Sequence, residues 1–156
     1  MIPDRLYQPL ARAATAVATR SHRLLTRLSG GRLGWSLGGL PMIFLRTTGA
    51  RTGQMRSVPL QAAREGGDWL VTGSNSGQHR LPGWVANLRA HPEATVVLRD
   101  REVPVRAEEV ADPAERERLY GVLTAQYPGY AAYPRHTDRT IPVFRLHPSA
   151  PDQRNG

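Results

Sequence analysis

The sequence predicts a mainly β fold with flanking helices, an antiparallel barrel of the α+β class. Two observations support this prediction. Short apolar runs with period-two alternation fill much of residues 41–148, and strand and helix patterns do not alternate as they do in parallel α/β folds. A chain of 156 residues with 40% hydrophobic content suits one globular unit. We expect residues 1–40 to form a basic helix and connector, 41–148 the barrel and 149–156 a disordered tail.

The N-terminal segment, residues 5–28, carries leucine, alanine and valine at near-helical spacing with arginines between them. This pattern predicts an amphipathic basic helix. Three placements stay open: the helix lies on a membrane surface, closes the end of a barrel with its apolar stripe, or docks with its basic face in solvent. Residues 29–39 are rich in glycine and predict a flexible connector.

Strands are expected wherever β-branched and aromatic residues recur between turn residues. The first two should pair around a glycine-flanked turn, and Asp100-Arg101 should join a later hairpin. Val103, Val105 and Ala107 alternate and should share one face of that hairpin. The predicted strands cover residues 41–47, 54–63, 69–74, 94–99, 102–107 and 141–146.

Two helices should pack outside the barrel. The first covers residues 83–90 and ends before His91-Pro92, because proline disfavours a helical residue before it. The second begins at Asp112-Pro113 and runs to about Gln126. Aspartate suits the N-cap and proline the first turn, and Glu115 stands where a capping box places its acidic residue.

The net charge of +8 is concentrated in the first two fifths of the chain. Residues 5–64 hold ten arginines and no acidic residue, whereas residues 65–156 hold eleven arginines and twelve acidic residues. This asymmetry predicts a polyanionic partner: a nucleic acid, an anionic membrane, or a ligand with several phosphate and carboxylate groups. Only Tyr7, Trp35 and Phe44 interrupt the acid-free stretch as aromatic residues. Bases would have few stacking platforms there, so we expect no nucleic-acid partner.

Several classes of chemistry are not expected. The absence of cysteine excludes disulfides, thiolate ligands and cysteine nucleophiles. The five histidines lack the spacing that pairs ligands on one helix face, so we expect no metal. Nucleophile-elbow, Walker and Rossmann patterns are missing. We find neither a secretion signal nor an apolar run of about 20 residues, and we expect a cytoplasmic protein. Peripheral contact with the inner face of the membrane is left open.

The segment Thr47–Leu60 is a candidate anion site. A turn that holds Gly49, Thr52 and Gly53 directs backbone amides toward one point, and an adjacent guanidinium offers a planar set of donors to phosphate or carboxylate. The alternative is an ordinary hairpin with solvated arginines. From this segment alone, both interpretations stay open.

Two further segments have the character of a site. The small-residue loop Gly73–Gly77 follows a strand and precedes a helix bearing Trp84 and Asn87, which allows a planar ligand to approach the backbone closely. The segment Gln126–Tyr133 holds three tyrosines at a spacing of three residues. They either pack between helix and barrel or donate hydrogen bonds to an oxygen on which negative charge develops.

The segment L-R-T-T-G-A-R-T-G-Q at residues 45–54, followed by Arg56 and Pro59-Leu60, resembles the T-T-G-R-K-[ST]-G-Q-x-R-x-x-P-L pattern of the deazaflavin-dependent nitroreductase family of actinobacteria. Further matches run in order over roughly residues 41–148. They are Ser74, Pro82-x-Trp84, Asn87-Leu88, His91-Pro92, Tyr127-Pro128-x-Tyr130 and Thr137-Asp138-Arg139-Thr140-Ile141-Pro142.

The resemblance implies a split β-barrel that binds coenzyme F420, a deazaflavin with a ribityl phospholactyl chain and a polyglutamate tail. It also implies hydride transfer from the reduced coenzyme to a small-molecule acceptor: a quinone, a nitroaromatic or an activated enone. Carried over by position, the cofactor-binding residues are Ala50, Arg51, Thr52, Gly53, Arg56, Ser57, Val58, Pro59, Leu60, Thr72, Gly73, Ser74, Asn75, Trp84, Val85, Ala86 and Asn87.

By the same resemblance, Gln61, Tyr127, Tyr130 and Tyr133 should face the acceptor, with Ser74 and Tyr130 as donors to the acceptor oxygen. This chain has Ala50-Arg51 where the family's nitroreductase has Arg-Lys, which leaves the choice of acceptor undetermined. The alternatives are a split barrel that binds FMN or haem, and a non-enzymatic module for nucleic acid or membrane surfaces. Pairing into a homodimer is also left open.

Overall fold

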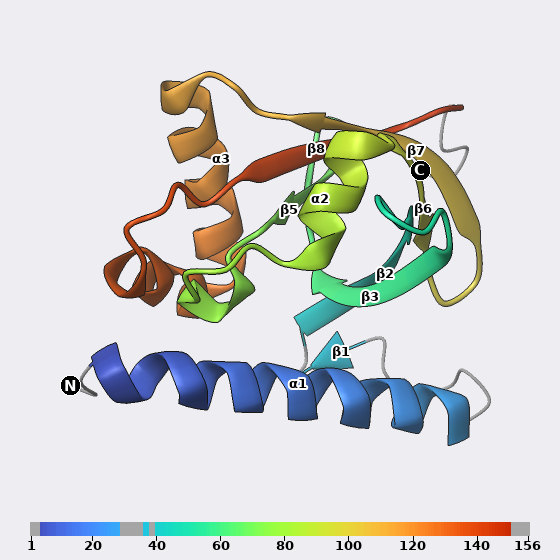
Figure 1. Ribbon diagram of the computed structural model, residues 1–156. Helices are drawn as coiled ribbons and strands as arrows, with labels where there is room; N and C mark the ends of the chain where they lie inside the picture. Colours follow the sequence, from blue (N-terminus) through green and yellow to red (C-terminus); the bar gives the residue numbers. More distant parts are fainter. Residues whose placement is uncertain (1–3, 29–35, 38–39, 151–156) are drawn as a thin grey trace.

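The computed structural model describes residues 4–28, 36–37 and 40–150 (Figure 1). Its helices are α1 (Asp4–Leu28), α2 (Gly83–Ala90) and α3 (Pro113–Gln126), with 3-10 segments η1 (Asn75–Gly77) and η2 (Pro128–His136). Its strands are β1 (Ser36–Leu37), β2 (Leu40–Thr48), β3 (Met55–Gln61), β4 (Ala63–Glu65), β5 (Asp68–Thr72), β6 (Glu93–Val97), β7 (Glu102–Glu109) and β8 (Val143–Pro148). The predicted tail lies outside the described residues from position 151 onward.

All strand pairs are antiparallel, and the strands follow the order β1-β2-β6-β7-β8-β5-β4, with β3 also paired to β2. A single residue, Ala62, separates β3 from β4 along the chain, although the two strands pair at opposite ends of this order. The sheet therefore curls toward closure, and the prediction of a mainly β split barrel with flanking helices is confirmed.

Period-two alternation divides the apolar residues between two cores. Trp69 and Val71 of β5 belong to the core inside the curled sheet, together with Phe144 of β8. Leu70 and Val143 belong instead to a second core beneath α3 and η2. The alternation decides which residues support the barrel and which support the helices.

Most of the predicted elements are confirmed. The strands flanking the glycine turn pair as expected, with Thr48 opposite Met55. The Asp112 carboxylate accepts a hydrogen bond from the Glu115 backbone N–H at 2.8 Å and caps α3. Two corrections concern boundaries. The glycine-rich segment is not only a connector, because Ser36–Leu37 forms β1, and the last strand begins at Val143.

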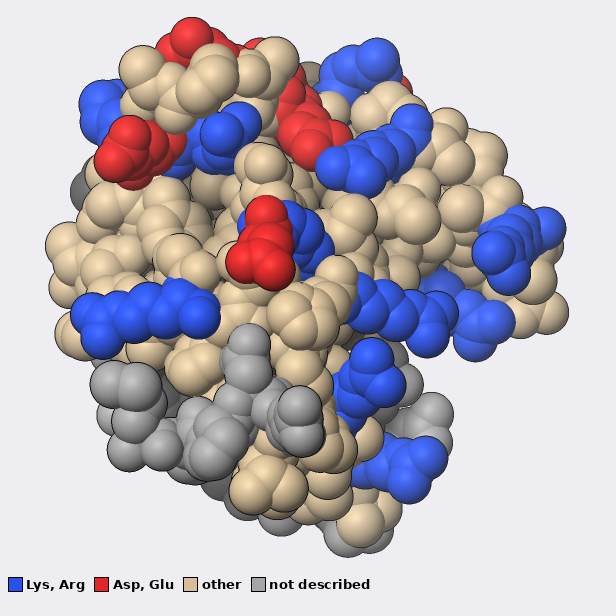
Figure 2. All heavy atoms as spheres, turned by 60° about the vertical axis from the view of Figure 1, so that its left-hand side comes forward, with Lys and Arg blue, Asp and Glu red and all other residues tan. Residues whose placement is uncertain are grey.

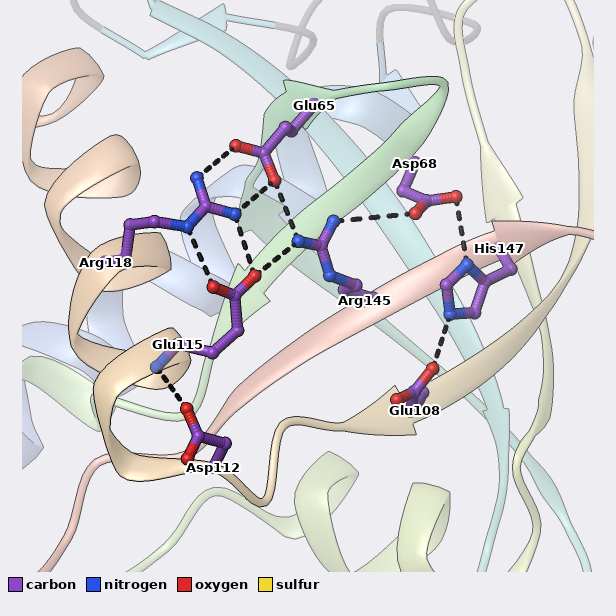
Figure 3. A network of polar contacts seen from close by, with 8 residues as sticks. All are labelled: Glu65, Asp68, Glu108, Asp112, Glu115, Arg118, Arg145 and His147. Carbon is purple, nitrogen blue, oxygen red and sulfur yellow. Dashed lines mark hydrogen bonds and ion pairs between the residues drawn. The ribbon is translucent and has the colours of Figure 1, made fainter.

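A network of ion pairs ties α3 to the sheet (Figure 3). Arg118 lies 2.8 Å from Glu65 and 2.7 Å from Glu115, and Arg145 of β8 lies 2.8 Å from both carboxylates. These hydrogen bonds, first those of Arg118, lower the pKa of Glu65 and of Glu115 to about 2. Both carboxylates therefore favour the folded state at neutral pH, and this contribution falls as the pH drops below about 4.5 toward 2.

The same network extends to His147, whose ring nitrogens lie 3.0 Å from Asp68 and 2.9 Å from Glu108 (Figure 3). Burial alone would lower the pKa of His147, but the hydrogen bonds that its ring donates to Glu108 and Asp68 outweigh this effect and raise the pKa. The cationic ring is therefore favoured in the folded protein, and it joins β8 to β5 and β7.

Helix α1 runs beneath the sheet and packs against η1, β3 and η2 (Figure 1). It docks through polar side chains, while Leu6, Leu10, Val17 and Leu24 are each more than half exposed. The predicted amphipathic helix is confirmed, and the placement in which its apolar stripe closes the barrel is wrong, because the described leucines and valine of the stripe face away from the barrel. The helix is docked, and Arg12 and Arg20 are exposed on it. Among the described helices, none combines the length and apolar character needed to cross a membrane.

Candidate functional site

A cavity of about 930 Å³ opens between the β2–β3 turn, the start of α2, the loop around η1, and α1. Figure 2 shows basic side chains bordering the hollow that opens at the right of this face, with the acidic side chains of the view lying elsewhere. The residues that the structure describes along this cavity are Arg12, Thr15, Ala16, Arg20, Thr47, Gly49, Ala50, Arg51, Thr52, Arg56, Ser57, Val58, Asn75, Gln78, Arg80, Leu81, Pro82, Gly83, Trp84, Ala86 and Asn87.

The β2–β3 turn is closed by its own backbone. The Gly49 N–H donates to the Gln54 carbonyl and the Gly53 N–H to the Gly49 carbonyl, both at 2.8 Å. A side chain at Gly49 would place its Cβ 2.9 Å from the Thr52 hydroxyl oxygen, and Gly53 has a positive φ of 67°. Both glycines are therefore required for a turn this tight. Arg51 projects from it into the cavity lining.

Asn87 fastens α2 to this turn. Its Oδ1 accepts from the Ala50 backbone N–H at 3.0 Å, and its Nδ2 donates to the Thr47 hydroxyl, also at 3.0 Å. Thr47 is almost fully buried, so its hydroxyl has few other partners within reach. Asn87 therefore sets the distance between two walls of the cavity.

Arg139 holds the third wall, the loop around η1. Its guanidinium donates to the carbonyl oxygens of Gly73, Ser74 and Gln78, each at 2.9 Å. Within the loop, Asn75 and Ser76 have positive φ angles of 46° and 54°, a conformation that costs free energy in non-glycine residues. Burial lowers the pKa of Arg139. The hydrogen bonds from Arg139 to these carbonyls compensate for the burial of its guanidinium and stabilise the strained loop.

Positive charge dominates the cavity. Among its described lining residues, five are arginines and none is aspartate or glutamate. Other arginines of the acid-free stretch are engaged elsewhere: Arg46 forms a two-bond ion pair with Glu102, and the Arg64 guanidinium lies 4.0 Å from the Trp69 ring centroid. The five arginines of the described cavity lining therefore stand together without a carboxylate among them, which is the arrangement that a multivalent anion requires.

An apolar wall faces this charge. Trp84 is 6% exposed, and its ring packs edge-on against Phe144 with centroids 5.6 Å apart. Leu81 and Pro82 lie beside it along the cavity, and Val58 lines it from β3. One cavity therefore offers both an apolar surface for a planar ring and charge for an anionic chain.

The structure brings ten of the seventeen expected cofactor-binding residues to the cavity. These are Ala50, Arg51, Thr52, Arg56, Ser57, Val58, Asn75, Trp84, Ala86 and Asn87. The other seven are absent from its described lining: Gly53, Pro59, Leu60, Thr72, Gly73, Ser74 and Val85.

Several of these seven support the cavity from behind. The Thr72 hydroxyl donates to the Pro142 carbonyl at 3.0 Å. A Cβ at Gly73 would lie 2.8 Å from both Val85 and Pro142, so glycine permits close packing of β5, α2 and the segment before β8. Ser74 is 5% exposed, and its carbonyl accepts from Arg139.

The tyrosine segment does not line the cavity in the structure. Tyr127 and Tyr130 are buried in the second core, and Tyr133 packs against it. The Tyr127 hydroxyl lies 2.9 Å from the Pro41 carbonyl oxygen and 3.1 Å from that of Ala62. Burial raises the pKa of Tyr130. The geometry favours the packing interpretation of these rings, and Gln61, on β3 opposite Met42, likewise lies outside the lining.

The sequence did not identify the cavity residues of α1, Arg12 and Arg20, or the loop residues Gln78 and Arg80. Arg139 appeared only as part of a matching block, without a role. The acid-free composition was a signal for the α1 arginines, but it did not reveal which helix face turns inward.

Comparison with known proteins gives concordant matches. The model of the F420H(2)-dependent quinone reductase family matches residues 18–148. An F420H(2)-dependent quinone reductase of Mycobacterium tuberculosis, strain H37Rv, is 35% identical over 131 residues, which cover 81% of this chain and 87% of the relative.

Two solved structures are similar in fold and sequence. One, an F420-H2 dependent reductase (FDR-A), has a TM-score of 0.63 and 36% identity, covering 69% of this chain and 94% of its own. The other, described as a domain-swapped dimer, has a TM-score of 0.65 and 32% identity, covering 82% of this chain and 94% of its own.

Proposed function

Since the chain belongs to the F420H(2)-dependent quinone reductase family, we propose that it reduces a quinone with a hydride from reduced coenzyme F420 bound in the cavity at the β2–β3 turn. Family membership confirms coenzyme F420 as the cofactor and oxidoreduction as the class of activity. The position of the coenzyme in this cavity and the identity of the acceptor are proposals.

The observation that carries the proposal is the set of five arginines without a carboxylate in the described lining. A phosphate followed by several glutamate carboxylates matches such a set, because each guanidinium can donate two parallel hydrogen bonds to an oxyanion. Arg51 and Arg56 flank the turn whose backbone would face the phosphate. The residues present therefore fit the anionic chain of the coenzyme.

The apolar wall at Trp84, Leu81 and Pro82 fits the ring system. When bound, the reduced coenzyme supplies the hydride. The side chains of the cavity would hold and orient the ring, and the apolar wall would exclude water from it. Thr47 and Asn87 are positioning residues, because the hydrogen bond between them fixes the β2–β3 turn against α2.

Neither Ser74 nor Tyr130 lines the cavity, so we propose for them a positioning and a packing role in place of proton donation. The proton that completes quinone reduction would then come from solvent through the open mouth. This assignment predicts that Tyr130→Phe keeps most of the turnover while leaving the fold intact. A loss of turnover without a loss of stability would restore Tyr130 as a donor.

A titration with F420, FMN and haem tests the cofactor, and the oxidation of reduced F420 by menadione, a nitroaromatic or an activated enone tests the acceptor. We expect binding of F420 and turnover with the quinone. Absence of F420 binding at micromolar concentrations would contradict the proposal. Turnover with only the nitroaromatic or the enone would show that the acceptor is not a quinone.

Arg51→Gln tests the position of the coenzyme. We expect weaker F420 binding at low salt and unchanged stability, because Arg51 is exposed in the turn. Arg99→Gln removes another exposed arginine, on the β6–β7 hairpin, and is the matched control. Equal affinity of both variants would place the coenzyme elsewhere.

The outward stripe of α1 supports a second proposal, contact with a lipid surface in which a quinone is dissolved. Leu6, Leu10, Val17 and Leu24 are 56–63% exposed and lie opposite the docked face. Leu10→Gln with Val17→Gln should reduce sedimentation with anionic phospholipid vesicles, whereas Met55→Gln, at a residue 58% exposed outside α1, should not. A change in oligomeric state with unchanged vesicle binding would assign the stripe to a homodimer instead.

A further inference from the structure

Helix α1 contributes one face to the coenzyme cavity. Arg12, Thr15, Ala16 and Arg20 line it at spacings of three, one and four residues, which place them on one side of a helix. The exposed leucines and valine lie on an adjacent side of the helix. An amphipathic helix ordinarily turns its apolar side toward the protein, whereas in α1 the described apolar residues are exposed and two arginines lie along the cavity.

Polar contacts fix this orientation. The Tyr7 hydroxyl donates to the Ser76 carbonyl at 2.7 Å, and the Gln8 side chain donates to the His136 carbonyl at 2.8 Å. The Tyr7 ring stacks on His136 with centroids 3.6 Å apart. These partners belong to η1 and η2, so the same loop that Arg139 clamps also holds the helix.

A second set of contacts lies next to the arginines. The Thr15 hydroxyl lies 3.2 Å from that of Ser76 and 3.3 Å from the Gln78 side-chain nitrogen. Thr15 is three residues from Arg12 and five from Arg20, so this anchor fixes the part of the helix that carries both cavity arginines. The placement follows from specific contacts along the helix and not from burial of its apolar side.

The docked helix adds two arginines to a cavity that is already positively charged. Arg12 and Arg20 share the cavity with Arg51, Arg56 and Arg80, and no acidic residue stands among the lining that the structure describes. Like charges around one cavity repel each other unless an anion lies between them. A ligand with more negative charge than one phosphate is needed to neutralise five guanidinium groups.

We propose that Arg12 and Arg20 bind the glutamate carboxylates of the coenzyme's tail, so that α1 is a wall of the site whose docking the tail stabilises. This inference rests on the proposed function and adds residues to it. The turn arginines occupy the phosphate position in that proposal, which leaves the helix for the carboxylates further along the chain. Both α1 arginines are exposed at the mouth, which suits a tail of variable length.

The test compares F420 carrying several glutamates with the tail-less phospholactyl form. Binding to the full-length protein is followed by the change in deazaflavin fluorescence. Wild type should bind the tailed form about five- to twentyfold more tightly at low salt, with the difference shrinking as salt rises. Arg12→Gln with Arg20→Gln should abolish most of that difference and leave the affinity for the tail-less form unchanged. Arg99→Gln should behave as wild type.

A second measurement does not depend on affinity. Trypsin cleavage within α1 should be slowed by the tailed coenzyme and much less by the tail-less form at equal occupancy. Equal binding of both forms to wild type, or an unchanged preference in the double variant, would overturn the inference while the proposed function stands. Failure of every form of F420 to bind would instead overturn the placement of the coenzyme in this cavity.

Discussion

Replacement of Arg139 by leucine removes the support of the loop around η1. Three backbone carbonyls, those of Gly73, Ser74 and Gln78, then lose a cationic donor at 2.9 Å. A hydrogen bond to a charged group contributes about 1.5–3 kcal/mol, but these sites are partly open to water and the contacts are not independent. We therefore expect Arg139→Leu to lower the free energy of unfolding by about 3 kcal/mol.

The measurement is urea unfolding of the variants, with F420 affinity recorded in parallel. Arg139→Lys should lose about half as much stability, because an ammonium group lacks the planar fork that reaches several carbonyls at once. Arg135→Leu, at an exposed arginine of η2, is the matched control and should change little. The coenzyme affinity of Arg139→Leu should also fall, since the loop bears part of the cavity wall. Wild-type stability in Arg139→Leu would refute the assignment of this residue as a clamp.

Three further predictions follow from contacts around the barrel. Asn87→Ala should weaken F420 binding, because it releases the turn from α2. Asn87→Asp should weaken binding more, since it adds a negative charge to the arginine cavity. Equal affinities of the two variants in fluorescence titration would contradict this order. Gly73→Ala should cost about 1–3 kcal/mol in urea unfolding through overpacking, whereas Gly83→Ala, with open space at its Cβ, should cost almost nothing. The raised pKa of His147 means that its charge stabilises the fold fully below about 6.5 and less as the pH rises through the folded value. His147→Gln should therefore lower the melting temperature at pH 6 and converge with wild type at pH 9.

The elements were predictable where local signals and tertiary packing agree. A short apolar run indicated β5, alternation indicated β7, and the Asp112-Pro113 start defined α3, because these patterns report burial and capping directly. The division of one strand's residues between two cores was not predictable, since strands such as β5 and β8 place buried apolar residues on both faces. Strand β1 was missed because Ser36–Leu37 is too short for an alternation signal, and its pairing depends on β2.

The site was predictable where residues are adjacent in sequence, as in the turn with Arg51 and Arg56. The tyrosine segment shows where this prediction fails. A spacing of three residues is equally compatible with rings that face a ligand and with rings that pack in a core. Burial of Tyr127 and Tyr130 is decided by α3 and β4, which no local pattern records.

The walls of the cavity show why neither composition nor motif alone indicates the whole site. Asn87 and Arg139 satisfy backbone groups of the turn and of the η1 loop, so the shape of the cavity depends on polar contacts between distant segments. The arginines that face the cavity come from α1, the turn and the η1 loop, and no single segment contains the whole set. Residues 5–64 hold no acidic residue, so none of the cavity segments drawn from that stretch places a carboxylate beside the proposed polyanion. In α1 the contacts of Tyr7, Gln8 and Thr15 with η1, η2 and Gln78 fix the orientation of the helix. This orientation leaves Leu6, Leu10, Val17 and Leu24 exposed and places Arg12 and Arg20 along the cavity.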